Sequence, residues 1–395
     1  MAPSVAIAGA GIGGLTAALA LAARGHPVTL LERRTGFDEE GAGIQLSPNA
    51  SRVLIGLGLG PALRRVAGEP ERVTIRAFAT GRTIGGMALG AFARERFGAP
   101  YWVVRRADLQ TVLLDAVRSR PVRLLMGRTV AGVDEGPDRI RLDVEKAGGP
   151  ETIEADLAVG ADGIWSRLRP ALGAARLPVS HGFVAARAVL PREAVEVEAE
   201  TGLWLGPGAH AVHYPIAGGR LVNLVLVRRR AEPVEGWSAR AEPAEVLAGL
   251  APAPALRRLL ETAPEWRLWS LFDLPARRLV RGRLALLGDA GHPVLPFLAQ
   301  GGALAIEDAA VLAAALDGRP VPEALAAYEA ARLARVRRVQ EAARRNGFSY
   351  HAGPLVALAR DLVLRRLGAE GMAERYAWLY GWRAPSAAPA FAQAG

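Results

Sequence analysis

The chain of 395 residues is long enough to bury a substantial core in one large domain or in two or three smaller ones. It contains no cysteine, which excludes disulfides, thiolate metal sites and a cysteine nucleophile, so we expect a cytoplasmic protein. The formal charge of +10 comes almost entirely from arginine, and no basic run is interleaved with aromatic residues. Binding of nucleic acid is therefore a minor alternative.

The uncharged run at residues 5–23 approaches the length of about 20 apolar residues that a membrane-spanning helix needs. Four glycines fall in its first half and no basic region precedes it, so neither a signal peptide nor a spanning helix fits the pattern. We expect no membrane partner, and we find no spacing that predicts a metal site.

The first 32 residues predict a β-strand, a helix and a second strand. VAIA at 5–8 is a short apolar run typical of a buried parallel strand, and VTLL at 28–31 predicts another, which ends at Glu32. Between them, LTAALALAARG at 15–25 has the length and composition of a helix and stops at a glycine. Together these segments form a βαβ unit.

Gly9, Gly11 and Gly14 lie between the first strand and the helix with the spacing GxGxxG. The first glycine permits a tight turn, the second lets the backbone approach a pyrophosphate, and the third lets helix and strand pack closely, with the phosphates at the helix N-terminus. Glu32 ends the next strand, where a carboxylate can bind ribose hydroxyls. The pattern predicts a dinucleotide site, and the alternative is a glycine-rich turn without a ligand.

The middle of the chain predicts further α/β structure and then a change of character. RRADLQTVLLDAV at 105–117 predicts an amphipathic helix, VRLLMGRTVAGVD at 122–134 a strand, a turn and a strand, and ADLAVGADG at 155–163 a buried strand that ends in Asp162. Between residues 182 and 227, alternating segments predict an antiparallel sheet.

The last third returns to the first domain. RLALLGDA at 283–290 predicts a strand that leads into Asp289, and residues 303–317 and 322–345 predict long helices. We therefore divide the chain into four parts. These are the first part of the nucleotide-binding domain at 1–177, an inserted sheet domain at 178–274, the return strand with the C-terminal helices at 275–384, and a flexible tail at 385–395.

Asp162 and Asp289 each follow a predicted strand. In an open parallel sheet, ligands bind at the carboxyl ends of the strands, where both carboxylates would lie. Either aspartate alone could simply cap a helix. Two such acids, beside a single dinucleotide fingerprint, favour one cofactor that extends across the sheet.

Three motifs carry a resemblance to a known family. GAGIGGLTAALALAARGHPVTLLERR, VGADGIWSRLR and GDAGHPVLPFLAQGGALAIEDA, in this order, resemble the FAD-dependent aromatic hydroxylases of the para-hydroxybenzoate hydroxylase fold, the class A flavoprotein monooxygenases. Four shorter segments resemble the salicylate and 3-hydroxybenzoate 6-hydroxylase branch: GAGIQLSPNA at 41–50, RRADLQ at 105–110, HAVHYPI at 210–216 and WLYGW at 378–382.

The resemblance implies an α/β fold, with a Rossmann-like FAD-binding domain, an inserted antiparallel-sheet substrate domain and C-terminal helices. It implies FAD as cofactor, NADH or NADPH as co-substrate, O2, a small aromatic substrate, and a monomer or homodimer. In the implied cycle NAD(P)H reduces the flavin, O2 adds to give the C4a-hydroperoxide, and the ring of a small, acidic phenol is hydroxylated.

The same resemblance assigns cofactor residues. Asp289 binds the ribityl hydroxyls, the turn that ends at Pro296 flanks the isoalloxazine, and the segment beginning at Gly301 leaves N–H groups free near the pyrimidine edge of the flavin. The implied cofactor set also contains residues that contact the pyrophosphate, the adenosine or the flavin. Its members are Gly9, Gly11, Gly13, Gly14, Glu32, Arg33, Gln45, Arg106, Asp162, Gly302 and Ala303.

His210 and Tyr214 are the candidates for contact with the substrate hydroxyl. In a strand they share one face, while His213 points to the other. A histidine with an ordinary pKa near 6.5 suits removal of a phenolic proton near neutral pH. The alternative for His210 is a structural histidine in a loop, and for His213 that alternative is favoured.

Gln300 precedes the glycine pair, and the resemblance implies a hydrogen bond to the substrate or the hydroperoxide, with a helix cap as the alternative. His292 is expected to be structural. An arginine could pair with a substrate carboxylate, but the sequence selects none of the many arginines, and Arg187 is disfavoured.

The chain departs from the resemblance at Ala186, where relatives often have tryptophan, and more mildly at Gly291. A missing aromatic side chain predicts an enlarged or reshaped substrate domain. It gives weight to an alternative in which the same scaffold acts on a bulkier aromatic or polyketide, or as an epoxidase. A basic Rossmann-like module that binds DNA is the non-enzymatic alternative, and the Asp289 motif argues against it.

Overall fold

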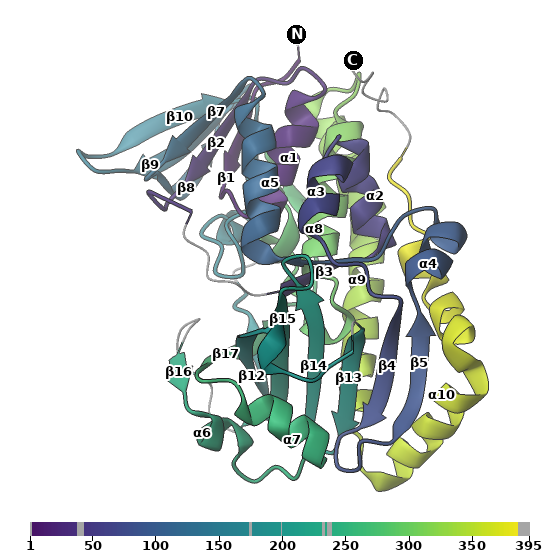
Figure 1. The fold of residues 1–395 in the computed structure, drawn as a ribbon. Helices are drawn as coiled ribbons and strands as arrows, with labels where there is room; N and C mark the ends of the chain where they lie inside the picture. The colour runs from purple at the N-terminus through teal and green to yellow at the C-terminus, as the bar shows by residue number, and fades with distance from the viewer. Residues whose placement is uncertain are drawn as a thin grey trace.

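The computed structural model describes residues 2–37, 43–173, 176–198, 200–230, 234 and 239–385. The tail predicted at 385–395 lies outside these residues from position 386 onward, as do Gly41 and Ala42 of the matched segment at 41–50. In the described part, two sheets dominate the molecule, one in the upper and one in the lower half of Figure 1.

The upper sheet is six-stranded and parallel except at one edge, where β18 runs antiparallel to β19. The predicted strands at 5–8 and 28–31 are its centre, and the strand after residue 155 pairs with the first of them. In spatial order its strands are β18 (Val280–Arg281), β19 (Leu284–Leu286), β11 (Leu157–Gly160), β1 (Val5–Ala8), β2 (Val28–Glu32) and β7 (Val122–Met126).

Both faces of the upper sheet are covered. Alternate residues of β1 and β2 pack against helices on one face, and the others pack against a small antiparallel sheet on the other face. The small sheet consists of β10 (Glu151–Ala155), β9 (Ile140–Glu145) and β8 (Thr129–Glu135). Burial on both sides explains why the strands of this sheet are continuous apolar runs without alternation.

The lower sheet has eight strands and takes them from two separate parts of the sequence. Its spatial order is β16 (Ala239–Ala241), β17 (Trp266–Asp273), β12 (Val179–Pro191), β15 (Leu221–Arg229), β14 (Ala209–Ile216), β13 (Thr201–Gly206), β4 (Arg72–Ala77) and β5 (Thr83–Ala88). The inserted sheet was predicted at 178–274, a range that leaves out β4 and β5. β13 and β4 pair in parallel, which joins the two parts.

Helices fill the space around both sheets (Figure 1). The α-helices are α1 (Ile12–Ala22), α2 (Pro48–Gly56), α3 (Gly60–Val66), α4 (Gly90–Phe97), α5 (Arg106–Arg118), α6 (Pro243–Leu247), α7 (Pro254–Glu261), α8 (Gly301–Ala315), α9 (Val321–Tyr350), α10 (Pro354–Arg375) and α11 (Ala377–Tyr380). Short 3-10 turns are η1 (Arg169–Leu172), η2 (Arg192–Ala194), η3 (Gly288–Ala290) and η4 (Pro296–Leu298), and β3 (Gly43–Leu46) pairs with β6 (Trp102–Arg105).

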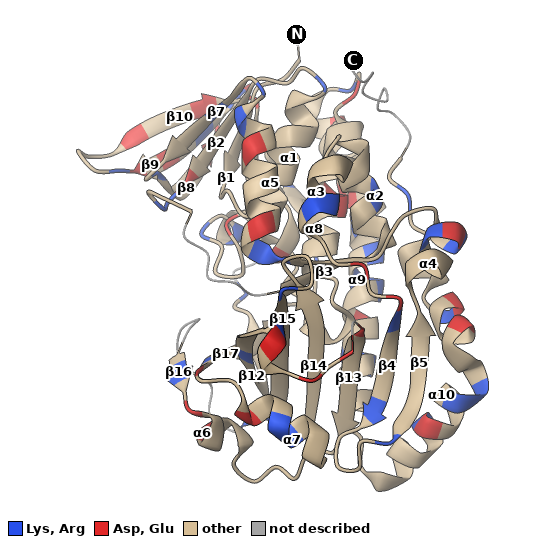
Figure 2. Ribbon diagram, in the orientation of Figure 1, with Lys and Arg blue, Asp and Glu red and all other residues tan. Residues whose placement is uncertain are grey.

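The predicted helices at 105–117, 303–317 and 322–345 correspond to α5, α8 and α9. Within the described residues no helix is long and apolar enough to cross a membrane. The run at 5–23 is split between β1 and α1, and the glycines in its first half form the turn between them. Lys and Arg are interspersed with Asp and Glu over both halves of the molecule (Figure 2).

The two faces of the lower sheet have different neighbours. One face packs against α7 and the loops around it, and the other faces the segment at 293–298 and the C-terminal end of α9. We call the second one the inner face. Ala186 lies in the core of the opposite face, together with Leu256 of α7. Strand alternation therefore points residue 186 away from the inner face, so its small side chain opens no space on that face.

Candidate functional site

The N-terminus of α1 and the N-terminal part of α8 lie against each other. A Cβ added at Gly13 would lie 2.7 Å from Cδ1 of Leu287 and 3.1 Å from Cβ of Ala305. Gly13, predicted as a cofactor residue, therefore has a packing function. Its contacts bring the glycine turn after β1 and the segment at 301–303 to the same region, as a cofactor that spans both would require.

The glycine turn has the geometry that a pyrophosphate needs. Gly9 has a φ of +103°, in the region that favours glycine, and a Cβ on Gly14 would come within 1.8 Å of the Gly9 carbonyl oxygen. Gly11 differs, because a Cβ at this position would meet no atom within 4 Å. The open space at Gly11, ahead of the α1 N-terminus, is where a phosphate group would fit.

Three acidic residues lie at or just after the carboxyl ends of parallel strands of the upper sheet, namely β2, β11 and β19, as predicted from the sequence. Glu32 accepts hydrogen bonds from the N–H of Ala10 at 2.8 Å and of Arg34 at 3.0 Å, which ties the end of β2 to the glycine turn. Asp162 Oδ2 accepts from the Arg167 N–H at 2.8 Å, whereas its Oδ1 is buried without a partner among the described residues.

Asp289 lies in η3, just after the end of β19. Its side chain is exposed, yet the surrounding protein displaces water from the carboxyl and raises its pKa, an effect that His292 and Arg106 oppose. A carboxyl in this position is accessible to a ligand and poorly hydrated without one. Arg33, Arg106 and Pro296 are also exposed.

Only the second glycine of the pair at the start of α8 is closely packed. A Cβ at Gly302 would lie 2.7 Å from Cδ1 of Ile44, whereas the closest atom to a Cβ at Gly301 is 3.7 Å away, on Val294. Ala303, also predicted as a cofactor residue, is buried in the core. The first N–H groups of α8 have no partner within the helix, which makes this end a donor for a polar or anionic group.

The inner face of the lower sheet brings together residues from three adjacent strands. Arg187 of β12 pairs with Val225 of β15, which in turn pairs with Val212 of β14. Since paired residues point to the same side, Arg187 projects from the face that carries His210 and Tyr214, at a level between them. His213 directly precedes Tyr214 on the same strand and therefore points to the opposite face, where its ring lies near that of Trp204.

Arg187 has no counter-ion among the described residues. Its Nε is buried without a hydrogen-bond partner, and its guanidinium lies over Trp269. Burial lowers the pKa of Arg187 to about 10; Tyr214 opposes this effect and Arg106 adds to it. The side chain is thus a cation at neutral pH in a poorly hydrated place, which is costly without an anionic partner. Sequence reasoning disfavoured this arginine because only the strand register shows its position.

Tyr214 is held by residues from the two-stranded β3–β6 ribbon. A Cβ on Gly43 would lie 2.5 Å from its Cε2 and 2.8 Å from its hydroxyl oxygen, so the lack of a side chain at residue 43 admits the ring. Burial raises the pKa of Tyr214 to about 12, against opposite effects from Arg187 and Gln45. Gln45 also accepts a hydrogen bond from the Tyr101 hydroxyl at 2.5 Å. Tyr214 is therefore a neutral phenol that can donate a hydrogen bond.

His210 is buried between aromatic rings at the other end of the inner face. Its ring centroid lies 5.5 Å from that of Phe297 in η4 and 5.3 Å from that of Tyr350 in α9. Nδ1 lies 2.9 Å from Nε2 of His351, a residue that sequence reasoning missed because it follows α9 without a recognisable motif. Burial, together with His351, lowers the pKa of His210 well below the ordinary value.

Gln300 is buried and its carboxamide is engaged within the protein. Nε2 donates to Ser47 Oγ at 2.9 Å and to the Leu298 carbonyl at 3.4 Å, and Oε1 accepts from Asn49 Nδ2 at 3.0 Å. Its side chain forms no cap hydrogen bond. The structure therefore leaves Gln300 without a free N–H for a substrate, and it does not cap the helix.

A buried ionic cluster supports the turn that carries Asp289. Asp308 accepts hydrogen bonds from the Gly288 N–H at 2.8 Å and from His292 Nε2 at 2.6 Å, and it pairs with Arg332 Nε at 2.7 Å. Arg332 also pairs with Glu307 at 2.8 Å. Burial opposes ionisation of Asp308, but His292 and Arg332 lower its pKa to about 2. His292 thus has the structural position that the sequence predicted.

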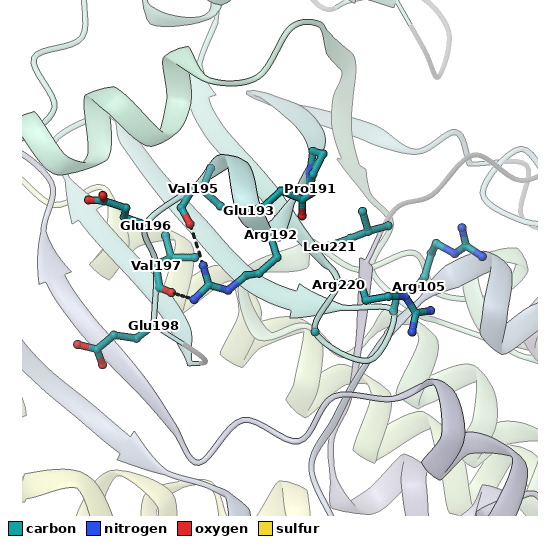
Figure 3. Close-up of a pocket in the computed structure, with 12 residues that line it drawn as sticks. Arg105, Pro191, Arg192, Glu193, Val195, Glu196, Val197, Glu198, Arg220 and Leu221 are labelled. Carbon is teal, nitrogen blue, oxygen red and sulfur yellow. Dashed lines mark hydrogen bonds between the residues drawn. The ribbon is translucent and has the colours of Figure 1, made fainter.

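One open pocket of about 1210 Å³ lies at the ends of β12 and β15. Figure 3 shows Arg192 in its wall, with hydrogen bonds to the carbonyl oxygens of Val195 and Val197, and Arg105 and Arg220 at one side. None of the predicted site residues lines this pocket. Its arginines are mixed with glutamates from residues 193–198, so it does not form a basic patch. Among the described residues no cluster of His, Asp and Glu could hold a metal ion.

The arrangement fits FAD. The space at Gly11 suits the pyrophosphate, Glu32 lies at the end of β2, where a carboxylate can bind a ribose, and Asp289 is exposed just after the end of β19. The N-terminal part of α8 packs against the turn that carries Asp289, because a Cβ on Gly288 would lie 2.9 Å from Cβ of Ala305. When bound, FAD would supply the redox chemistry with O2.

Comparisons with known proteins agree with this arrangement. The chain matches the family described as FAD binding domain over residues 3–343. It is 37% identical to 3-amino-4-hydroxybenzoate 2-monooxygenase of Streptomyces cremeus over 95% of this chain and 94% of that protein. It is 35% identical to 3-hydroxybenzoate 6-hydroxylase 1 of Aquipseudomonas alcaligenes, over 96% and 97%. The crystal structure of Klebsiella pneumoniae HpxO with FAD and uric acid superposes with a TM-score of 0.84 at 28% identity, covering 95% of this chain and 96% of that one.

Proposed function

Since this chain belongs to the FAD binding domain family and is an FAD-dependent aromatic monooxygenase that uses NAD(P)H and O2, we propose that it hydroxylates a small aromatic acid with a phenolic hydroxyl. The observation that carries the proposal is Arg187, a half-buried cation on the inner face whose buried Nε has no hydrogen-bond partner and whose guanidinium has no counter-ion among the described residues. Two similar proteins are named for hydroxybenzoates, which are anions of this kind.

In this proposal, three polar residues of the inner face each have one function. Arg187 binds the carboxylate, and its register with Val212 places it between the two residues that can contact the hydroxyl. Tyr214 donates a hydrogen bond from its neutral phenol, and His210 accepts the phenolic proton. Loss of that proton makes the ring more nucleophilic, which hydroxylation by an electrophilic oxygen requires.

The cofactor residues follow the same arrangement. We propose that Gly9, Gly11 and Gly14 surround the pyrophosphate and that Asp289 binds the ribityl chain. We propose that Glu32 and Arg33 bind the adenosine end of FAD and that Arg106 lies near the flavin and the pyrophosphate. Asp162 holds the turn after β11 through its hydrogen bond from Arg167, and we assign Gln300 the function of fixing the α8 start to α2 through Asn49.

The alternative of a bulkier aromatic, a polyketide or an epoxidation reaction is not favoured. Its sequence basis was the small Ala186, which packs on the α7 side of the sheet and not on the inner face. The relatives named for hydroxybenzoates support a small acid instead. A cytoplasmic location and a monomeric or dimeric state remain predictions.

The experiment that tests the proposal compares matched ligands. FAD-loaded enzyme is assayed with a panel of hydroxy- and amino-hydroxybenzoates and with the corresponding amides, using NADH and NADPH in turn. Hydroxylated product is identified directly, so that peroxide formed without hydroxylation is not counted. We expect acids to be hydroxylated with a KM at least about tenfold below that of their amides, because the amide cannot neutralise Arg187. Equal turnover of amides and acids would refute the proposal.

A second experiment tests the proposed base. We expect His210→Ala to lower hydroxylation by about 100-fold or more while FAD affinity is unchanged, since His210 lies on the inner face and not at the glycine turn. His213→Gln, on the opposite face of the same strand, is the matched control. Full activity in His210→Ala would remove this residue from the mechanism.

A further inference from the structure

His210 and His351 form a buried hydrogen bond. The other contact of the His351 ring determines which of the two histidines donates. His351 Nδ1 lies 2.7 Å from the carbonyl oxygen of Gly347, one turn earlier at the end of α9. A carbonyl oxygen only accepts hydrogen bonds, so His351 Nδ1 must carry a proton. The state of His351 Nε2, 2.9 Å from His210 Nδ1, then decides which ring donates.

His351 is neutral in this environment. Burial lowers the pKa of His351 to about 4, and the charge of Arg229 on β15 adds to the lowering against the opposing effect of the Gly347 carbonyl. A neutral imidazole has one N–H, and that proton is already on Nδ1. Nε2 of His351 is therefore an acceptor, and His210 must donate to it from Nδ1.

We propose that His351 is a positioning residue that fixes His210 as the Nδ1–H tautomer and so leaves Nε2 of His210 unprotonated toward the substrate. No other hydrogen bond of the His210 ring occurs among the described residues, so Nε2 stays available for a ligand. The effect of this tautomer on a substrate rests on the proposed function. The tautomer itself does not depend on any substrate.

The charge that develops when His210 accepts a proton is disfavoured by burial and by His351, which hold the pKa of His210 well below its ordinary value, and the hydrogen-bond chain to α9 opposes this effect. The phenolic O–H bond breaks, its electron pair stays on oxygen, and an N–H bond forms at His210 Nε2. The resulting imidazolium still donates Nδ1–H to His351, whose own N–H donates to Gly347 near the C-terminus of α9. The partial negative charge of a helix C-terminus favours a cation nearby.

Packing holds both rings in place. Phe183 of β12 stacks on His351 with centroids 4.6 Å apart and an interplanar angle of 29°, and the guanidinium carbon of Arg229 lies over the Phe183 ring, 5.1 Å from its centroid. Phe297 contacts both histidines, at 5.5 Å from each centroid. Tyr350 contacts His210 from α9, and burial raises the pKa of its hydroxyl, so that it stays neutral.

The direct test is the tautomer itself. The chain has only 6 histidines, so FAD-loaded protein labelled with 15N-histidine gives few ring signals, which single substitutions can assign. In the absence of substrate at neutral pH, we expect His210 and His351 both to carry the proton on Nδ1. A wild-type His210 with its proton on Nε2 would overturn the proposal.

Variants of His351 test its effect on His210. In His351→Ala the acceptor is lost, and we expect the His210 proton to redistribute between the two nitrogens. In His351→Gln the side-chain carbonyl can accept from His210, so we expect the Nδ1–H tautomer to persist. An unchanged tautomer in His351→Ala, or its loss in His351→Gln as well, would count against the proposal. His213→Gln is the control, and its spectrum should keep both signals.

A ligand readout links the tautomer to function. The absorbance of a bound phenolic acid reports its ionisation, and we expect its apparent pKa to rise in His351→Ala and to return toward the wild-type value in His351→Gln. Hydroxylation should fall roughly 10- to 100-fold in His351→Ala, the range seen when the partner of a functional imidazole is removed. If no aromatic acid is hydroxylated but the tautomers are as expected, the proposed function fails and the assignment of His351 stands.

Discussion

The guanidinium carbon of Arg187 lies 4.4 Å from the centroid of the Trp269 ring. Trp269 belongs to β17 and pairs with Ala185, two residues before Arg187 on the neighbouring strand. An aromatic face below a guanidinium stabilises its charge and leaves the edges of the group free for a planar anion. The contact thus holds an unpaired cation in place before any substrate binds.

Arg187 should determine the preference for acids. In Arg187→Gln we expect KM for the preferred aromatic acid to rise about 30-fold, which corresponds to a loss of about 2 kcal/mol for a charged hydrogen bond. Arg187→Lys should recover only part of this, because an ammonium group cannot bind a carboxylate through two parallel bonds. Arg220→Gln, an exposed arginine in the open pocket, is the control. Identical KM values in Arg187→Gln and in the wild type would contradict the assignment.

Alanine substitutions at two glycines of the GxGxxG motif should have different effects, one on FAD binding and the other on stability. Gly11 has a φ of −72°, which any residue adopts, and open space at its Cβ position, so Gly11→Ala should fold normally but bind FAD about tenfold more weakly or worse. Gly14→Ala should destabilise the protein, since its Cβ would overlap the Gly9 carbonyl. Thermal unfolding of the cofactor-free proteins and quenching of flavin fluorescence measure the two effects. Equal stability of both variants would show that the turn is not packed as described.

Acid should destabilise the protein through buried neutral histidines. Burial, aided by Arg76, lowers the pKa of His213 to about 4, whereas the unfolded chain has the ordinary value near 6.5. Between these values the unfolded state binds more protons, so stability is complete above pH 6.5 and falls as the pH drops toward 4. The full difference is about 3 kcal/mol for this residue, of which about 2 kcal/mol is lost at pH 5.

His213→Leu isolates that contribution. Denaturant unfolding at pH 7 and pH 5 should give a smaller difference in free energy for the variant than for the wild type. Activity should be unaffected, because His213 lies on the face opposite His210. A variant with the same pH dependence as the wild type would place the acid sensitivity elsewhere.

The buried ionic cluster should be sensitive to removal of its cation. Arg332→Met leaves Glu307 and Asp308 buried with less compensation, and we expect a loss of about 3 to 5 kcal/mol in the free energy of unfolding. Arg345→Met, at an exposed pair with Glu341, should change stability by less than about 1 kcal/mol. Because Asp308 also holds the Gly288 N–H, the surviving folded protein should bind FAD more weakly. A loss below 1 kcal/mol for Arg332→Met would mean that the cluster contributes little.

The upper half of the fold was predictable because its signals are local. Each central strand is a short apolar run, and the turn after β1 needs glycine at defined positions, so sequence alone located β1, β2, β11 and β19 and the acids at their ends. The helices α2, α4 and α10 and the strands β4 and β5 were not predicted. β4 pairs with β13, more than a hundred residues away, and β5 joins the sheet only through β4, so nothing in their own composition shows that they belong to the lower sheet.

The polar residues of the inner face were only partly predictable. His210 and Tyr214 lie on one strand, and because side chains alternate between the two faces of a strand, the sequence predicted that both point to the same face. Arg187 joins them through the register of three strands, and His351 joins them through the end of a helix that packs across the sheet. Such contacts depend on tertiary structure, as does the engagement of Gln300 with Ser47 and Asn49, which a helix-start pattern does not reveal.

The parallel pairing of β13 with β4 has a consequence for protein engineering. A segment cut at 178–274 would leave the edge of β13 without its neighbour and open to association with other chains. Chimaeras between this enzyme and its relatives should therefore exchange residues 72–88 together with 179–273. Recombination that separates these two stretches would mix strands from different parents within a single hydrogen-bonded layer.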